Sequence, residues 1–326
     1  MSFRGSLRRF CCQASIPDQR IYGGIPMKSV PKNQMWSKSQ QQAFKKLIDI
    51  GETFFYAEWE GAGLRPRLDP LVVGPSGAGK THLIRAVAEQ LALPVLRITH
   101  GEWIVAGSRS SSAHTTEKVR KFIQQNERGI VHMDELDKAR AGFQSEWTIS
   151  VFAEIFCLID RVEPAGGRQQ DWSPELLKRL SKDIWFIGTG TWQDLWTKQS
   201  APSIGFGGAT ARIDPADFTA DIHRTRLIPD ELLRRFCSDI ICLNSATPDE
   251  YRQAARHFGL VKIARKLNIK LDYENGASGN LGARWLEETY ASLLVTAWKR
   301  GRRDILPERV QEVEIADMES SDEIPF

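Results

Sequence analysis

Short apolar runs alternate with longer helix-like stretches through the first two thirds of the chain. Four runs have the length of buried strands: 70–73, 95–98, 130–133 and 184–187. Three stretches between them have the composition or spacing of helices: 80–92, 117–125 and 149–159. Strands that alternate with helices predict a mostly parallel sheet covered by helices on both faces, which is an α/β fold.

The pattern changes at both ends of this region. Residues 37–50 have helical spacing, with Ser37 placed to cap the helix. Residues 197–225 are rich in Gly, Ser, Thr and Pro and predict a long irregular loop. From residue 244 onward the apolar runs are helical: Pro248–Phe258, Leu260–Leu267 and Leu281–Lys299. We therefore expect a large α/β domain over 37–243, a hinge at 244–248, and a small helical domain over 244–305.

Composition excludes several other classes of protein. Hydrophobic residues make up 41% and charged residues 26% of the 326 residues, which excludes a mainly disordered, collagen-like or coiled-coil protein. No apolar run approaches the roughly 18 residues of a membrane span, so no membrane partner is expected. The five cysteines form no CxxC pair, which argues against a disulfide scaffold or zinc knuckle and favours the reducing cytoplasm.

The net charge of +3 conceals charged ends. Residues 1–36 carry six Lys or Arg against one Asp and predict a flexible basic arm. Residues 308–326 carry seven acidic groups against one Arg, so 306–326 is expected to be a solvated acidic tail. The two ends are therefore places to look for partners.

A phosphate-binding loop follows the first predicted strand. The pattern GxxxxGK[ST] is met between a strand and a helix by Gly74, Pro75, Ser76, Gly77, Ala78, Gly79, Lys80 and Thr81. The glycines let backbone N–H groups surround phosphate oxygens, and the helix that follows presents its positive end. Lys80 would hold the β- and γ-phosphates of ATP, and the Thr81 hydroxyl would ligate Mg²⁺.

A second acidic site follows the third predicted strand, in the segment GIVHMDELDK. Carboxyl ends of parallel strands meet at one sheet edge, so Asp134 and Glu135 would emerge beside the phosphates. Asp134 would hold Mg²⁺ through its water shell, and Glu135 would polarise the attacking water. His132 lies within the strand, and we interpret it as a packed side chain.

Three further motifs would complete a hydrolytic site. Thr189 ends the fourth strand and is placed to hydrogen-bond the water or the γ-phosphate, with Thr191 as the alternative. Arg234 and Arg235 end a helix, and one of them could reach the γ-phosphate of a neighbouring subunit. Arg284 opens the last long helix, from which it would sense the nucleotide in its own subunit.

The order of these motifs resembles the AAA+ ATPases, and more narrowly the ClpX and HslU group of protein unfoldases. The resemblance covers roughly residues 65–300. It implies a P-loop AAA+ domain, with its parallel sheet between helices, followed by a small all-α lid. It also implies a homo-oligomeric ring, usually hexameric, with ATP and Mg²⁺ between subunits and a central pore. Arg235 matches the family's arginine finger if Phe236 anchors the comparison, and Arg234 matches if Pro229 does.

Three departures from the family pattern bear on the substrate. The zinc-binding amino-terminal domain has no counterpart in residues 1–36. The aromatic grip of the first pore loop falls on Gly107–Ser110, where Arg109 stands without an aromatic neighbour. Trp103 could substitute, although a packed core position is the better interpretation. Ile204-Gly205-Phe206 resembles the loop that docks ClpX on its peptidase ring, so a Clp-type peptidase is a candidate partner.

Three functions remain open at this stage. The first is a ring ATPase that remodels or unfolds a protein substrate, with or without a peptidase. The second is a nucleic-acid-associated ATPase (a loader, or a transposition or defence regulator) that uses Arg109 and the basic arm. The third is a nucleotide-driven switch. The sequence does not place the adenine pocket.

Overall fold

A computed structural model describes ten segments of the chain: 37–57, 66–109, 112–138, 146–164, 172–192, 220–221, 224, 230–236, 240–278 and 282–305. The strands are β1 Leu71–Val73, β2 Val95–Thr99, β3 Gly129–Asp134, β4 Ile184–Gly190 and β5 Ile240–Cys242. The helices of the α/β part are α1 Lys38–Tyr56, α2 Lys80–Gln90, α3 Thr115–Gln125, α4 Glu146–Asp160, α5 Pro174–Lys182 and α8 Asp230–Leu233. The later helices are α9 Pro248–His257, α10 Leu260–Leu267, α11 Tyr273–Ser278 and α12 Ala283–Lys299.

The strands form one parallel sheet in the order β2-β3-β4-β1-β5. Val73 pairs with Gly190 across β1 and β4, and Thr99 pairs with Asp134 across β2 and β3. The carboxyl ends of these strands therefore meet at one edge of the sheet, where ligands bind in open α/β folds. This register brings the P-loop, Asp134 and the end of β4 together.

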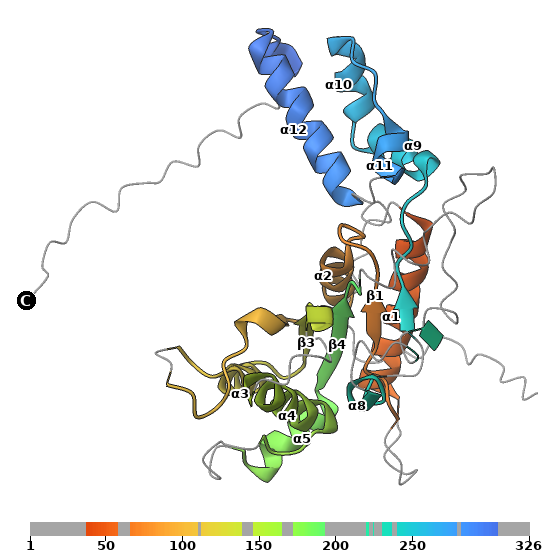
Figure 1. Cartoon of the computed structure of the whole chain (residues 1–326). Helices are drawn as coiled ribbons and strands as arrows, with labels where there is room; N and C mark the ends of the chain where they lie inside the picture. The colour runs from red at the N-terminus through yellow and green to blue at the C-terminus, as the bar shows by residue number, and fades with distance from the viewer. Residues whose placement is uncertain are drawn as a thin grey trace, which may run out of the picture.

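Both faces of the sheet are covered, as the continuous apolar strands predict. Ile130 packs with Leu47 of α1 and Leu83 of α2 on one face. The next residue, Val131, packs with Val119 of α3 and other residues of α4 and α5 on the opposite face. Figure 1 shows the two helical layers on either side of the strands.

The four helices after residue 247 pack around a hydrophobic cluster of their own. Tyr251 of α9 and Trp285 of α12 meet edge to face within it, with ring centroids 5.1 Å apart. In Figure 1 these helices stand beyond the carboxyl edge of the sheet, above α2 and β1. They are therefore placed next to the loops that follow the strands.

The fold class predicted from the sequence is confirmed, and the predicted strands and helices form within a few residues of their expected bounds. Ser37 caps α1 as expected, since its hydroxyl accepts from the Gln40 backbone N–H and the Gln40 side chain returns to Ser37. Strand β5 and the helices α5 and α11 were not anticipated. The predicted basic arm, the acidic tail and Ile204-Gly205-Phe206 lie outside the described residues.

A buried ion pair joins three elements at the amino end of the sheet. The Arg161 guanidinium donates to both Asp69 oxygens at 2.8 and 3.1 Å, and to the backbone oxygen of Ile184 at 3.2 Å. Asp69 also accepts from the Phe186 backbone N–H at 3.1 Å. The pair therefore ties the start of β1 to β4 and to the end of α4.

Within the described segments, no helix has the length and apolarity needed to cross a membrane.

Candidate functional site

The P-loop encloses the Lys80 side chain. Gly77 and Gly79 adopt φ values of 78° and 85°, in the left-handed region that favours glycine. The Lys80 ammonium donates to the backbone oxygens of Gly74 at 2.8 Å and Pro75 at 3.1 Å. Its third bond goes to the Thr191 hydroxyl at 3.1 Å. Burial lowers the pKa of Lys80 to about 8, although the carboxylates of Asp137 and Asp134 oppose that shift.

Asp134 lies at the centre of the site, and both of its carboxylate oxygens are hydrogen-bonded. Oδ1 accepts from the Thr189 hydroxyl at 2.5 Å and from the Glu135 backbone N–H at 2.9 Å. Oδ2 accepts from the Thr81 hydroxyl at 3.2 Å and from Arg97 at 2.9 Å. Burial alone would raise the pKa of Asp134, but the bonds from Thr189 and Arg97 outweigh it and hold the pKa below its ordinary value.

Thr189 and His132 form the buried floor beneath Asp134. The Thr189 side chain is inaccessible to solvent, and His132 is 1% exposed, in agreement with its expected packed position. The Thr189 hydroxyl donates its one proton to Asp134, so it accepts from His132 Nε2 at 2.9 Å. Burial lowers the pKa of His132 to about 4, so the ring is neutral at pH 7. Thr189 therefore positions Asp134, whereas Thr191 is the hydroxyl that contacts Lys80.

Glu135 follows β3 in a left-handed conformation, with a φ of 61°. This turn directs the chain away from the strand, and the Glu135 side chain is 37% exposed. Its carboxylate pairs with Lys138 at 2.7 Å, while its backbone N–H bonds Asp134. Glu135 thus stands at the solvent side of the site, where it can reach a water molecule.

The amino end of α12 touches the P-loop directly. The Ala283 backbone N–H donates to the Gly77 oxygen at 2.9 Å. Gly282 has a φ of 57°, and a Cβ added there would lie 2.0 Å from that same oxygen. Only glycine therefore allows this approach of the last helix to the loop. Arg284, one residue further on, is exposed, and its charge helps lower the pKa of Lys80.

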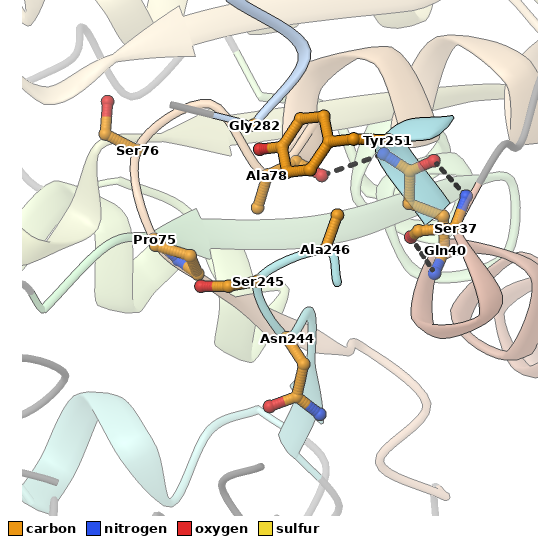
Figure 2. A pocket seen from close by; sticks show the side chains of 10 residues that line it. All are labelled: Ser37, Gln40, Pro75, Ser76, Ala78, Asn244, Ser245, Ala246, Tyr251 and Gly282. Atoms are coloured by element: carbon orange, nitrogen blue, oxygen red, sulfur yellow. Dashed lines mark hydrogen bonds between the residues drawn. The ribbon is translucent and has the colours of Figure 1, made fainter. Parts of the chain in front are cut away.

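A small cavity lies where the P-loop, α1, the 244–248 segment and α9 meet (Figure 2). It is lined by Ser37, Gln40, Pro75, Ser76, Ala78, Asn244, Ser245, Ala246, Tyr251 and Gly282. The Gln40 amide donates to the Ala78 backbone oxygen at 3.0 Å, which fixes α1 against the loop. The Glu250 carboxylate accepts from the Lys38 backbone N–H at 2.8 Å, which fixes α9 against α1. Its lining combines apolar and amide groups, but at about 10 Å³ the cavity has room for only about one water molecule, so it would have to widen to admit a nucleobase.

The two candidate finger arginines have different environments. Arg235 bonds Asp160 at 2.7 Å and lies over the Phe156 ring at 4.1 Å, so α4 holds it. Arg234 is exposed, and among the described residues no hydrogen bond or ion pair engages its guanidinium. Among the described residues, Arg234 is therefore the less constrained of the two arginines.

The loop after β2 contains the predicted pore position. Trp103 is 4% exposed, and its indole N–H donates to Glu154 of α4 at 2.7 Å. The same carboxylate accepts from the Ala106 backbone N–H at 2.6 Å. Trp103 is therefore a packed anchor of the loop, as the better interpretation expected. Arg109 is exposed at the far side of the loop.

Two features of the site were missed by sequence reasoning. Arg97 lies in β2, and no motif marked it. The cavity beside Tyr251 is assembled from α1, the P-loop and α9, which are far apart in sequence. The only available signal was the charge of Arg97 within an otherwise apolar strand.

The fold and this site define a P-loop nucleotide-binding domain. Residues 70–199 match the family model described as "ATPase family associated with various cellular activities (AAA)".

Two curated relatives are similar to the chain over part of their lengths. Protein mac-1 of Caenorhabditis elegans is 27% identical over 273 residues, which cover 74% of this chain and 32% of that protein. The ATP-dependent Clp protease ATP-binding subunit ClpX of Treponema denticola is 25% identical over 183 residues, which cover 50% of this chain and 43% of that protein. The chain thus spans less than half the length of either relative.

Proposed function

We propose that the chain binds Mg²⁺–ATP and hydrolyses it at the Asp134 cluster. The observation that carries this proposal is one continuous set of contacts, in which Lys80, Thr81 and Asp134 meet beside Glu135 at the carboxyl edge of the sheet. A simple nucleotide binder needs the P-loop alone, whereas hydrolysis also needs a base beside it. Glu135 is the group in position to serve as that base.

The donor groups fit a magnesium ion shared with a nucleotide. The Thr81 hydroxyl and the Asp134 carboxylate lie 3.2 Å apart, and oxygen ligands of this kind are what Mg²⁺ prefers. Mg²⁺ held there would neutralise charge that develops on the phosphates during hydrolysis. Thr191 takes the polar role at the end of β4, because it reaches Lys80 while Thr189 is occupied with Asp134.

The remaining residues act around the phosphates. In this proposal the adenine enters beside Tyr251 once the cavity there widens, and residues 244–305 act as a lid whose Arg284 senses the nucleotide. Arg234 extends to the γ-phosphate of a neighbouring subunit in a hexameric ring, while Arg235 anchors its helix to α4. This division of roles favours the alignment anchored at Pro229, in which Arg234 is the finger.

Glu135→Gln tests the proposed base. The amide keeps the shape of the side chain but cannot accept the proton of water, so we expect ATP binding to persist while phosphate release falls by at least about 100-fold. Glu102→Gln is the matched control, because Glu102 lies on the loop after β2 and, among the described residues, its hydrogen-bond partner is Thr99. If the Glu135→Gln protein releases phosphate at the normal rate, Glu135 is not the base.

The favoured output of this cycle is remodelling or unfolding of a protein substrate. The similarity to ClpX supports it, and that relative is by name the ATP-binding subunit of a protease. Docking on a Clp-type peptidase through Ile204-Gly205-Phe206 belongs to this proposal. Its test is ATP-dependent loss of structure in a tagged, folded substrate, with Glu135→Gln as the inactive control.

A second candidate function is a nucleic-acid-stimulated ATPase. Arg109 is exposed on the loop after β2 and the aromatic Trp103 is buried, which suits phosphate contact better than a grip on polypeptide. The end of α12 also favours it, because Trp298 is 64% exposed there and the Arg303 guanidinium lies 5.7 Å from the centre of its ring. The same helical part of the chain carries other exposed basic residues: Lys262, Arg265, Lys266, Lys270 and Lys299.

Salt dependence separates this second candidate from the first. Single- or double-stranded DNA should stimulate ATP turnover, and the stimulation should fall steeply as salt rises. Arg109→Ala should remove it while unstimulated turnover stays the same. Turnover that is indifferent to both DNA and RNA at low salt would leave protein remodelling, or a nucleotide-driven switch, as the output.

A further inference from the structure

Arg97 makes a contact with the Asp134 carboxylate that the proposed hydrolytic roles do not use. Its Nε and Nη2 atoms both lie 2.9 Å from one oxygen, Oδ2. That oxygen also accepts from the Thr81 hydroxyl at 3.2 Å. The guanidinium therefore occupies the same carboxylate oxygen that faces the second expected magnesium ligand.

The surroundings of Arg97 allow it to leave this contact. Strand β2 lies at the edge of the sheet formed by the described strands, and none of those strands lies beyond Arg97. Its side chain is 46% exposed, whereas the Asp134 side chain is 6% exposed. Asp134 keeps its bonds from Thr189 and the Glu135 backbone when Arg97 departs. The carboxylate is therefore held from one side by buried groups and from the other by a movable one.

Mg²⁺ and Arg97 cannot both bind Oδ2 favourably. Two guanidinium N–H groups and one hydroxyl already use the acceptor capacity of that oxygen. A divalent cation within about 4 Å would also repel the guanidinium strongly in this partly buried setting. Binding of the metal, directly or through its water, must therefore be accompanied by displacement of Arg97.

We propose that Arg97 is a positioning residue that holds Asp134 in the nucleotide-free state and competes with Mg²⁺ for its Oδ2 oxygen. Loading with Mg²⁺–ATP then releases Arg97 toward solvent at the sheet edge. This proposal rests on the proposed ATP site. It adds that Arg97 lowers the affinity of that site for Mg²⁺, because the metal must displace the guanidinium. In this proposal Arg97 acts on the site through Asp134 and not by a contact of its own with the nucleotide.

The test measures ATP binding as free Mg²⁺ is varied. Equilibrium dialysis with radiolabelled ATP is carried out on the full chain carrying Glu135→Gln, so that turnover does not interfere. Arg97→Met is then added, because it keeps the length of the stem and removes the guanidinium. We expect the free Mg²⁺ concentration at half-maximal binding to fall at least threefold, and ATP binding without Mg²⁺ to change less than twofold. Arg97→Lys should give an intermediate midpoint.

Arg85→Met is the matched control. Arg85 is an exposed arginine of α2 whose charge also acts on His132, but it makes no bond to Asp134. Its removal should leave the Mg²⁺ midpoint unchanged. An unchanged or raised midpoint in Arg97→Met would overturn the proposal, and so would a large loss of Mg²⁺-free ATP binding, which would mean that Arg97 contacts phosphate. Absence of ATP binding in every variant, including the parent, would instead overturn the proposed function itself.

Discussion

The two ends of the sheet each contain an aspartate bonded to an arginine, and the two pairs are built differently. At the amino end, Arg161 and Asp69 are 2% and 7% exposed, and the guanidinium also bonds three backbone oxygens. At the carboxyl end, Asp134 is equally buried, but Arg97 is 46% exposed and bonds the carboxylate alone.

The difference separates a structural ion pair from one that can open. If Arg161 left, a buried carboxylate and several backbone oxygens would lose their hydrogen-bond donor, so Arg161 holds β1, β4 and α4 together. Arg97 can turn into solvent while other groups continue to hold Asp134. The same chemical pairing thus stabilises the fold at one end of the sheet and serves a ligand site at the other.

The largest expected effect comes from breaking the buried Arg161–Asp69 ion pair. Arg161→Met leaves Asp69 charged and buried, so it should lower the free energy of unfolding by about 3–5 kcal/mol, measured by urea denaturation. The double variant Asp69→Asn/Arg161→Met removes both charges and should recover part of that loss. A single variant as stable as the parent would show that the pair is not what joins these elements.

Two threonines near the Arg97–Asp134 pair should differ in their effects on turnover and stability, and both effects should be smaller than that of Arg161→Met. Thr191→Val removes the hydroxyl on Lys80 and should reduce ATP turnover about 100-fold with little change in stability. Thr189→Val leaves Asp134 and His132 without their shared partner and should lower stability by about 1–3 kcal/mol. If Thr189 is instead the residue that contacts the nucleotide, Thr189→Val should lose turnover and Thr191→Val should not. Thermal melts and phosphate release assays on the same preparations separate the outcomes.

The lowered pKa of Lys80 predicts a pH dependence at the carboxyl end. Below about pH 8 the ammonium is charged and attracts phosphate, and above it the free protein loses that charge. ATP affinity should therefore fall about tenfold between pH 7 and pH 9. Titration of ATP at fixed free Mg²⁺ measures it. Affinity that holds steady across this range would mean that Lys80 stays protonated.

The smallest expected effect is the change in protein stability when the Arg97–Asp134 pair is broken. Arg97→Met should change the free energy of unfolding by less than about 1 kcal/mol, because the arginine is half exposed and Asp134 retains three other donors. Urea denaturation beside Arg161→Met compares the two pairs directly. A loss as large as that of Arg161→Met would contradict the distinction drawn between them.

Much of this site could be predicted from the sequence, because its parts are local. The P-loop and the Asp134-Glu135 pair each follow an apolar strand, and parallel strands bring their ends to one edge. Arg97 could not be predicted in this way, since its contact depends on the register of β2 against β3. The roles of Thr189 and Thr191 were also beyond reach, because β4 is buried on both faces and shows no alternation.

The cavity beside Tyr251 illustrates a second limit. Its walls come from α1, the P-loop and α9, and the bond between Lys38 and Glu250 joins residues 212 positions apart. Local patterns predict each of these elements but not their meeting. Similarly, α5 was missed although Ser173 caps it and Pro174 begins it, because its short apolar face gave no long period.

Phosphate release from ATP by the purified wild-type chain, measured with Mg²⁺ and with Mg²⁺ removed by chelation, tests the central claim most directly. Turnover should require Mg²⁺ and should be lost in Asp134→Asn, because that carboxylate and the Thr81 hydroxyl are the two metal ligands that we propose. Turnover that continues without Mg²⁺, or that survives Asp134→Asn unchanged, would contradict the assignment of this cluster as a hydrolytic site.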